Sequence, residues 1–110
     1  MIKKTPAMIE REQATWNKWK DEGDGYYSLI GQFYGVVAYI SLPKNHPCIG
    51  KSYDDLEPDV NGGLTFSEEN VFGWDYDHYQ NNSSPEIDIP NAINYFKKLL
   101  CTINYHQLPY

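Results

Sequence analysis

The chain has few cysteines and no long apolar run. Its 110 residues include two cysteines, Cys48 and Cys101, which form no Cys-x-x-Cys pair. Two cysteines are too few for a disulfide framework, and their spacing argues against a zinc clip or a redox motif. No segment approaches the roughly 18 apolar residues of a membrane span, and no apolar run of signal-peptide length follows the basic start. We therefore expect a protein that stays in the reducing cytoplasm where it is made, away from membranes.

Positive charge is also missing from a long central stretch. Residues 52–88 contain no Lys or Arg but ten acidic residues: Asp54, Asp55, Glu57, Asp59, Glu68, Glu69, Asp75, Asp77, Glu86 and Asp88. Phosphate backbones are bound by Lys and Arg, so this half of the chain should repel DNA and RNA. The same charge would attract a basic partner surface. The alternative is that these acids only keep the protein soluble, in line with its formal net charge of -6.

What the sequence does contain predicts one domain. Thr5 as cap and Pro6 in the first turn predict a helix over residues 6–21, ended by Gly23 and Gly25, within a peripheral N-terminal segment 1–25. Alternating β-branched and aromatic residues predict strand over residues 26–42, which Gly31-Gln32 could divide into a hairpin. Residues 44–58 should be loop with one helical turn near residues 53–56. Residues 64–66 and 71–76 should form a second hairpin.

The clearest pattern lies near the C-terminus. An apolar stripe at helical spacing predicts an amphipathic helix, with Asp88 as cap and Pro90 in the first turn; it comprises Ile89, Ala92, Ile93, Phe96, Leu99, Leu100 and Ile103. The whole chain, residues 1–110, is then a single α+β domain. It has an N-terminal helix, an antiparallel sheet of three to four strands and the C-terminal helix packed on one face, in a two-layer arrangement.

Few residues suggest catalysis. His46, Asp75 and His78 are a possible metal site, because imidazole and carboxylate bind divalent metals, but their spacing matches no known motif. Each also has a structural explanation as a turn or strand-end residue. Cys48 lies near His46 without a nucleophile motif, and Gly62-Gly63 lacks the spacing of a phosphate loop and is typical of a turn. We therefore expect no cofactor and no metal.

Three ordered blocks of sequence resemble a known family. They are residues 46–56, beginning His46-Pro47 and including Tyr53-Asp54-Asp55; residues 60–66, with Gly62-Gly63; and residues 73–78, Gly-Trp-Asp-Tyr-Asp-His. Small proteins of phages and prophages of Gram-positive bacteria show His-Pro-x-x-Gly-Lys-x-Tyr-Asp-Asp, then Val-His-Gly-Gly-Leu-Thr, then Gly-Phe-Asp-x-x-His. The resemblance covers about residues 39–100. This chain has Asn61 where the family has histidine and Trp74 where it has phenylalanine. The family's biochemical activity is unsettled, so the resemblance implies a phage setting.

These observations lead to a binding hypothesis. Small acidic phage proteins often inhibit host defence, so we expect an anti-CRISPR-type inhibitor of a host protein with a basic surface, such as a CRISPR effector nuclease, rather than an enzyme. The expected contacts are acids and tyrosines: Asp54, Asp55, Asp59, Glu68, Glu69, Asp77, Tyr53, Tyr76 and Tyr79. Two alternatives stay open. One is a metal-dependent hydrolase using His46, Asp75 and His78, and the other is a small-ligand or nucleotide binder.

Overall fold

A computed structural model describes residues 3–76 and 83–107, with no side chain described from residue 101 on. The elements in chain order are α1 (Pro6–Thr15), β1 (Lys20–Gly23), β2 (Tyr26–Gln32), β3 (Val36–Ser41), the short 3-10 turn η1 (Tyr53–Asp55), β4 (Phe66–Glu68), β5 (Val71–Asp75) and α2 (Pro85–Gln107). All strand pairs are antiparallel, in the order β1-β2-β3-β5-β4. The α+β class, both hairpins and both helices are confirmed, while the sheet has five strands instead of three or four. The first hairpin turns at residues 33–35 and not at Gly31-Gln32, which belong to β2, and the first strand of the second hairpin is Phe66–Glu68 instead of residues 64–66.

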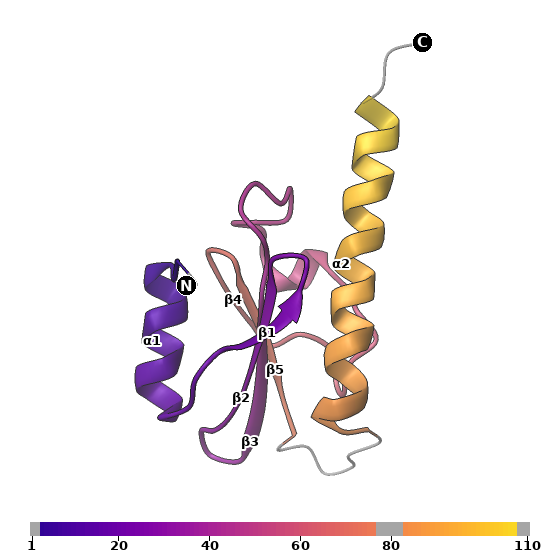
Figure 1. The fold of residues 1–110 in the computed structure, drawn as a ribbon. Coiled ribbons are helices and arrows are strands. Elements are labelled where there is room, and N and C mark those ends of the chain that lie inside the picture. The colour runs from indigo at the N-terminus through magenta and orange to yellow at the C-terminus, as the bar shows by residue number, and fades with distance from the viewer. Residues whose placement is uncertain (1–2, 77–82, 108–110) are drawn as a thin grey trace.

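The two helices cover opposite faces of the sheet, with α1 on one side and α2 on the other (Figure 1). Alternate residues of the central strand β3 show why: Ala38 and Ile40 pack with α2, whereas Val37 and Tyr39 pack with α1. The expected two-layer arrangement is therefore wrong. The first helix is short and weakly apolar, but Ala7 and Met8 are buried on the sheet and make α1 a third layer.

The α2 face holds the larger core. The predicted stripe is confirmed at Ile89, Ala92, Ile93 and Phe96, which are all buried. The helix begins at Pro85, three residues before the expected cap, because the Ser84 carbonyl already accepts from the Ile87 and Asp88 amides. Asp88 lies inside the first turn instead of capping it.

The first helix ends six residues earlier than predicted. Trp16 adopts a left-handed conformation and its amide donates to the Glu12 carbonyl at 2.8 Å, which closes the last turn. Lys20–Gly23 then forms β1, joined to β2 by Asp24 and Gly25, both with positive φ. Asp-Gly with two positive φ angles is a two-residue hairpin turn. The sequence prediction took Gly23 and Gly25 as the end of the first helix and therefore missed this strand and its turn.

The start of α1 is fixed by the turn between β4 and β5. Thr5 caps the helix as expected, accepting from the Met8 amide at 3.3 Å. A Glu69 carboxylate oxygen accepts from the Ala7 amide at 2.9 Å, and the Thr5 hydroxyl donates to Asn70 at 2.7 Å. A carboxylate at a helix N-terminus is favourable because it satisfies an amide and opposes the helix dipole. This contact holds α1 against the sheet.

Candidate binding site

Two of the largest exposed side chains stand at backbone positions that disfavour them. Trp16 has φ 62° and is 91% exposed, and Tyr34 has φ 57° and is 88% exposed. Left-handed conformation costs a residue with a side chain roughly 1–2 kcal/mol, which Gly and Asn largely avoid. A side chain this exposed makes few packing contacts that could offset that cost. Strained backbone of this kind is a reason to suspect a functional role.

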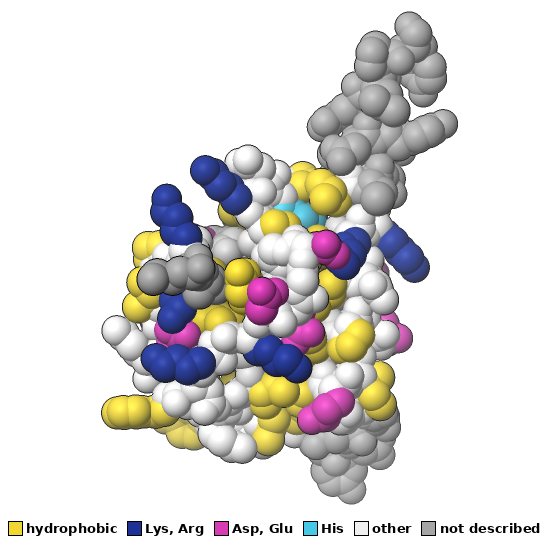
Figure 2. All heavy atoms as spheres, in the orientation of Figure 1, with side chains coloured by type: hydrophobic (Ala, Val, Ile, Leu, Met, Phe, Trp, Pro, Cys, Tyr) yellow, Lys and Arg dark blue, Asp and Glu magenta, His cyan; other side chains and the backbone are white. Residues whose placement is uncertain are grey.

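Both residues lie at the same end of the sheet. Trp16 follows the last turn of α1, and Tyr34 lies in the turn joining β2 to β3; Figure 1 shows these two segments at the end opposite the β4–β5 turn. Phe33, half exposed, meets the Tyr34 ring edge-on at 5.1 Å between centroids. Apolar side chains are visible at the lower end of the face in Figure 2, while Lys and Arg gather over its upper and left parts with acidic side chains scattered among them. This end of the molecule is apolar and aromatic.

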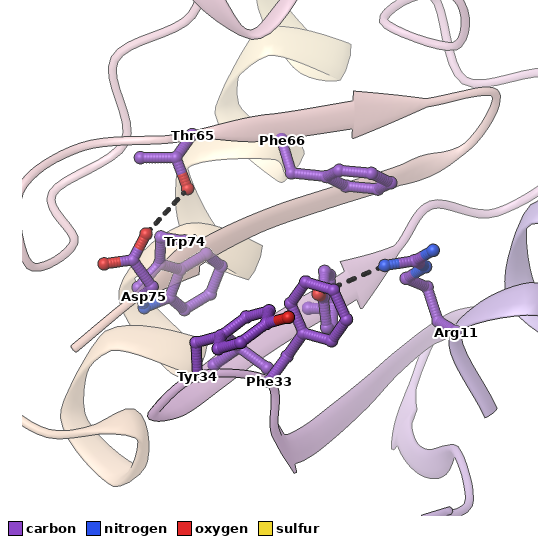
Figure 3. A pocket seen from close by; sticks show the side chains of 9 residues that line it. Arg11, Phe33, Tyr34, Thr65, Phe66, Trp74 and Asp75 are labelled. Atoms are coloured by element: carbon purple, nitrogen blue, oxygen red, sulfur yellow. Dashed lines mark hydrogen bonds between the residues drawn. The ribbon is translucent and has the colours of Figure 1, made fainter. Parts of the chain in front are cut away.

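A pocket of about 570 Å³ opens beside this turn on the α1 face of the sheet. We call it the aromatic pocket; its lining includes Arg11, Phe33, Tyr34, Phe66 and Asp75 (Figure 3). The residues come from α1, the β2–β3 turn, β4 and β5, so the sheet topology brings together side chains up to 64 positions apart, from residue 11 to residue 75. Arg11 lies at one end and Asp75 at the other, with aromatic rings between them.

The Arg11 end is already a cation–aromatic contact. Its guanidinium carbon lies 4.9 Å from the centroid of Phe66 and 5.6 Å from that of Tyr39. Its charge is balanced by Glu10 at 2.7 Å, and one N–H donates to the Tyr39 hydroxyl at 3.4 Å. The Nε atom is buried without a hydrogen-bond partner among the described residues. The rings at this end therefore accept a guanidinium group.

The Asp75 end is where the second and third resembled blocks meet. Thr65 donates from its hydroxyl to the Asp75 carboxylate at 3.3 Å, and the Asn61 side-chain amide donates to the Asp75 carbonyl at 3.3 Å. Asn61 is itself buried. It stands where the resembled family has histidine, and here it links the loop before β4 to the end of β5.

Behind this end, a buried network joins β5 to α2. The Trp74 indole donates to the Tyr76 hydroxyl at 2.9 Å, and that hydroxyl donates to Asp88 at 2.6 Å. Asp88 also accepts from the Asn61 amide at 3.1 Å and from the Ser83 hydroxyl at 2.7 Å. Burial, and next the hydrogen bond to Asp88, raise the pKa of Tyr76 well above its usual range. Tyr76, predicted as a contact residue, therefore uses its hydroxyl inside the protein.

The predicted acidic contacts fall into two groups on opposite sides of the sheet. Asp54, Asp55 and Asp59 are exposed on η1 and on the segment that runs along α2. Glu68 and Glu69 are exposed in the β4–β5 hairpin beside the start of α1, where Glu69 accepts from the Ala7 amide. These five acids therefore do not form one patch.

The predicted tyrosine contacts differ in their placement. Tyr53 is half-buried against the larger core, and its amide donates to the Ser67 hydroxyl at 3.0 Å. Asp77, His78 and Tyr79 lie outside the described residues. Tyr53 therefore presents only part of its ring to a partner.

Of the proposed metal residues, His46 and Asp75 are described, and they do not lie together. His46 is buried in the α2-side core, where Nδ1 accepts from the Cys48 amide at 3.0 Å and Nε2 lies 3.0 Å from the Phe96 carbonyl. The Cys48 amide can only donate, so Nδ1 carries no hydrogen. Nε2 therefore carries the ring hydrogen and donates it to the Phe96 carbonyl. Asp75 lies at the other end of the sheet, on the α1 face. The described residues contain no group of three or more His, Cys, Asp or Glu side chains that could hold a metal.

Cys48 does not complement His46 as a nucleophile. It is buried, and burial raises the pKa of its thiol, so the reactive thiolate is disfavoured. Sulfur chemistry therefore has no support at this position.

A second hollow of about 860 Å³ lies between the start of α1 and the loop after β3, with Lys3, Lys4 and Lys44 on its lining. Several polar groups here serve the fold: Lys4 pairs with Glu12 at 2.8 Å, and the Asn70 side chain donates to the Leu42 carbonyl at 3.2 Å. Surface lysines alone do not define an anion site. The aromatic pocket, whose walls combine aromatic rings with charged groups, is therefore the stronger candidate for a binding site.

Sequence reasoning did not find this site. It included Trp16 in the first helix, predicted over residues 6–21, and gave Arg11, Phe33 and Tyr34 no role. The available signal was Tyr34-Gly35 after a strand, which is typical of a turn and would have exposed the aromatic residue. Comparisons with protein families, with curated proteins and with solved structures each found no match. In the part of the chain that the structure describes, no helix is long and apolar enough to cross a membrane.

Proposed function

We propose that this protein acts by binding another protein, and that it inhibits that partner rather than catalysing a reaction. The observation that carries the proposal is the pair Trp16 and Tyr34, two highly exposed aromatic residues held in left-handed backbone at one end of the molecule. Aromatic residues dominate binding energy at protein interfaces, where removing one buried anchor costs about 2 kcal/mol or more. Folding gives little reason to keep these side chains, whereas binding gives a direct one.

The charge distribution favours a basic partner. The formal net charge is -6, and residues 52–88 contain no Lys or Arg. Exposed acids such as Asp54, Asp55 and Asp59 would accelerate encounter with a positive surface and exclude nucleic acid. Under this proposal the aromatic end supplies most of the affinity and the acids supply the steering.

The resemblance to small phage proteins supplies the setting of the proposal. A phage protein that binds a basic host protein is suited to block a nucleic-acid-binding enzyme, because its acidic side chains can occupy the channel that receives phosphate backbones. The proposed partner is therefore a host defence nuclease of the CRISPR effector type, and the proposed place of action is the host cytoplasm.

The test is partner capture with matched variants. Tagged wild-type protein, the double variant Trp16→Asn/Tyr34→Asn and the control Ile87→Asn are incubated with host lysate. Ile87 is a suitable control because it is an exposed apolar side chain, 58% accessible, in the first turn of α2, which covers the opposite face of the sheet from α1 and the aromatic pocket. We expect one stoichiometric partner bound by wild type and control and lost by the double variant.

The captured partner must also be inhibited. Purified partner is assayed for nuclease activity with increasing amounts of wild type, and activity should reach zero near one equivalent. If the double variant Trp16→Asn/Tyr34→Asn retains the partner as well as the control Ile87→Asn does, binding through the aromatic end is wrong. If the nuclease activity of the partner is unchanged at saturation, inhibition is wrong.

A further inference from the structure

The hollow between the start of α1 and the loop after β3 is larger than the aromatic pocket, at about 860 Å³ against about 570 Å³. The two segments that form it lie at the same end of the sheet, opposite the β2–β3 turn (Figure 1). We call this space the N-terminal hollow. Met8 and Leu42, each 2% exposed, and the half-buried Tyr27 contribute apolar surface to its lining. Pockets for small molecules have mostly apolar walls and a few polar groups that fix orientation.

Hydrogen bonds between distant segments hold the walls of the N-terminal hollow. The Thr5 hydroxyl donates to Asn70 at 2.7 Å, and the Asn70 side chain donates to the Leu42 carbonyl at 3.2 Å. The Gly50 amide donates to the Glu69 carbonyl at 3.0 Å, which joins the loop after β3 to the β4–β5 turn. These contacts belong to the fold, so a ligand would not have to order the walls on binding.

Ser41 supplies a polar group that the fold leaves unused. It is the last residue of β3, lines the hollow and is 1% exposed. Its side chain lies on the α1 face of the sheet, because it alternates along the strand with Val37 and Tyr39, which pack with α1. Its hydroxyl oxygen is buried without a hydrogen-bond partner among the described residues. Buried hydroxyl groups are nearly always hydrogen-bonded, since an unpaired one opposes folding, so an acceptor in the hollow would satisfy it.

The charge around the hollow is opposite in sign to that of the whole chain. The ionised groups are Lys3, Lys4 and Lys44 (+3) with Glu12 and Glu69 (-2). Their sum is +1, whereas the formal net charge of the chain is -6. Lys4 pairs with Glu12 at 2.8 Å, while Lys3 and Lys44 are exposed and have no acidic partner among the described residues. Two ammonium groups are therefore available to an anion.

We propose that the N-terminal hollow binds a small organic anion, a molecule with an apolar body and one carboxylate or phosphate group. The body lies against the apolar lining. The charged group accepts a hydrogen bond from the Ser41 hydroxyl and pairs with Lys3 and Lys44. Hydrogen bonds to an ionised acceptor are stronger than neutral ones, so the buried hydroxyl adds to what the lysines provide. This site lies at the opposite end of the sheet from the exposed aromatic residues, and it does not rest on the proposed function.

The proposal can be tested with simple aromatic anions. The ligands 2-naphthoate and 2-naphthyl phosphate are each titrated into the 15N-labelled full-length chain, in a buffer free of other carboxylates and phosphates, and amide chemical shifts are followed. We expect saturable shifts around residues 4–8, 27 and 41–46 with at least one ligand, and weaker binding as salt is raised. The tighter of the two identifies the anionic group that the site takes.

Two kinds of control separate the apolar body from the charge. Neutral 2-naphthamide keeps the body, and its Kd should be at least about five-fold higher, because it lacks the charge that the lysines balance. Acetate and inorganic phosphate keep a charge, and they should give no saturable shift at the same concentrations because they bury almost no apolar surface.

Three variants assign the binding to the hollow. Ser41→Ala removes a hydroxyl without a described partner, so the chain should fold while the Kd for the tighter naphthyl anion rises at least about five-fold. Lys44→Gln should raise this Kd about two- to five-fold and reduce its salt dependence. Lys51→Gln is the matched control and should leave the Kd unchanged, since Lys51 is an exposed lysine of the same loop that does not line the hollow. If Ser41→Ala does not fold, Lys44→Gln decides the question.

Saturable binding of a naphthyl anion that is weakened in Ser41→Ala and in Lys44→Gln would establish the site. No saturable binding of either anion, shifts confined to other residues, or an equal Kd for 2-naphthamide would overturn it. An unchanged Kd in Ser41→Ala or in Lys44→Gln would also overturn it, as would an equal rise in Lys51→Gln.

Discussion

The Tyr76 hydroxyl donates a 2.6 Å hydrogen bond to the carboxylate of Asp88, and this contact ties the end of β5 to the first turn of α2. Asp88 is 2% exposed, so it would be costly to bury if its charge were not satisfied. The Asn61 amide and the Ser83 hydroxyl complete its shell of donors. One carboxylate in the first turn of α2 therefore holds together the loop before β4, the end of β5 and the residues just before the helix.

Removing this carboxylate should be among the most damaging single changes. Asp88→Ala leaves three donors without their acceptor, and hydrogen bonds to a charged group contribute roughly 1.5–3 kcal/mol each, not additively. We expect the free energy of unfolding to fall by at least about 2 kcal/mol, measured by urea denaturation. Asp59→Ala, at an exposed acid on the same side of the sheet, is the control and should change it by less than about 0.5 kcal/mol. Equal effects of the two variants would contradict the structural role of Asp88.

The same contact predicts a loss of stability in alkali. Burial and the hydrogen bond to Asp88 raise the pKa of Tyr76 in the folded protein, whereas in the unfolded chain it is about 10. Above about pH 10 the unfolded chain therefore loses this proton while the folded protein keeps it, so stability falls as pH rises. Tyr76→Phe lacks the titrating group. The stability advantage of wild type over Tyr76→Phe should be full near pH 8 and should shrink between pH 10 and 11, measured by urea unfolding at each pH. A constant advantage would contradict the raised pKa.

Replacing the exposed aromatic residues should raise the free energy of unfolding, whereas the changes above lower it. Tyr34→Asn relieves a left-handed tyrosine, and we expect the free energy of unfolding to rise by about 0.5–1 kcal/mol while partner binding weakens. Trp16→Asn should behave in the same way. Ile87→Asn removes an exposed apolar side chain without changing a left-handed position, and should give no such gain. A loss of more than about 1 kcal/mol in Tyr34→Asn would show that the ring supports the fold through Phe33.

The sequence predicted the elements whose signal is local and strong. The stripe through Ile89, Ala92, Ile93 and Phe96 repeats at the helical period, and burial follows directly from it. Strand β1 was missed because Lys20–Gly23 is a polar edge strand with no apolar alternation. Only the Asp-Gly pair after it carried a signal.

The candidate site could not be predicted in the same way. Its pocket takes Arg11 from a helix, Tyr34 from a turn and Asp75 from the end of a strand, and no sequence pattern relates such distant positions. His46 and Asp75 show that residue types can also suggest a shared site that the fold does not form. Their residue types suggest a shared metal, but strand order places them at opposite ends and faces of the sheet.

Gly73, beneath the pocket, has no room for a side chain. A Cβ atom added at Gly73 would lie 2.4 Å from the Tyr39 ring, which is too close for any real contact. Gly73→Ala should therefore lower the free energy of unfolding by about 1–3 kcal/mol through overpacking. In a Tyr39→Ala background both ring contacts of the added methyl group are gone and the 3.2 Å approach to the Ala38 carbonyl remains, so the cost of Gly73→Ala should become smaller. The same cost in both backgrounds would place its origin in the strand backbone.

His46 gives a prediction that separates structure from metal chemistry. Both ring nitrogens are used inside the protein, by the Cys48 amide and the Phe96 carbonyl, and the ring packs edge-on against Phe96. His46→Ala should therefore lower the free energy of unfolding by about 2–4 kcal/mol. Because a zinc ion bound at His46 would have to displace one of these hydrogen bonds, added Zn²⁺ should leave the melting temperature of wild type unchanged. A metal present at 100 times its Kd would add about 2.7 kcal/mol, which is easily seen in a melting curve. A rise with Zn²⁺ that disappears in both His46→Ala and Asp75→Asn would show that the two residues meet at a metal, and would restore the hydrolase hypothesis.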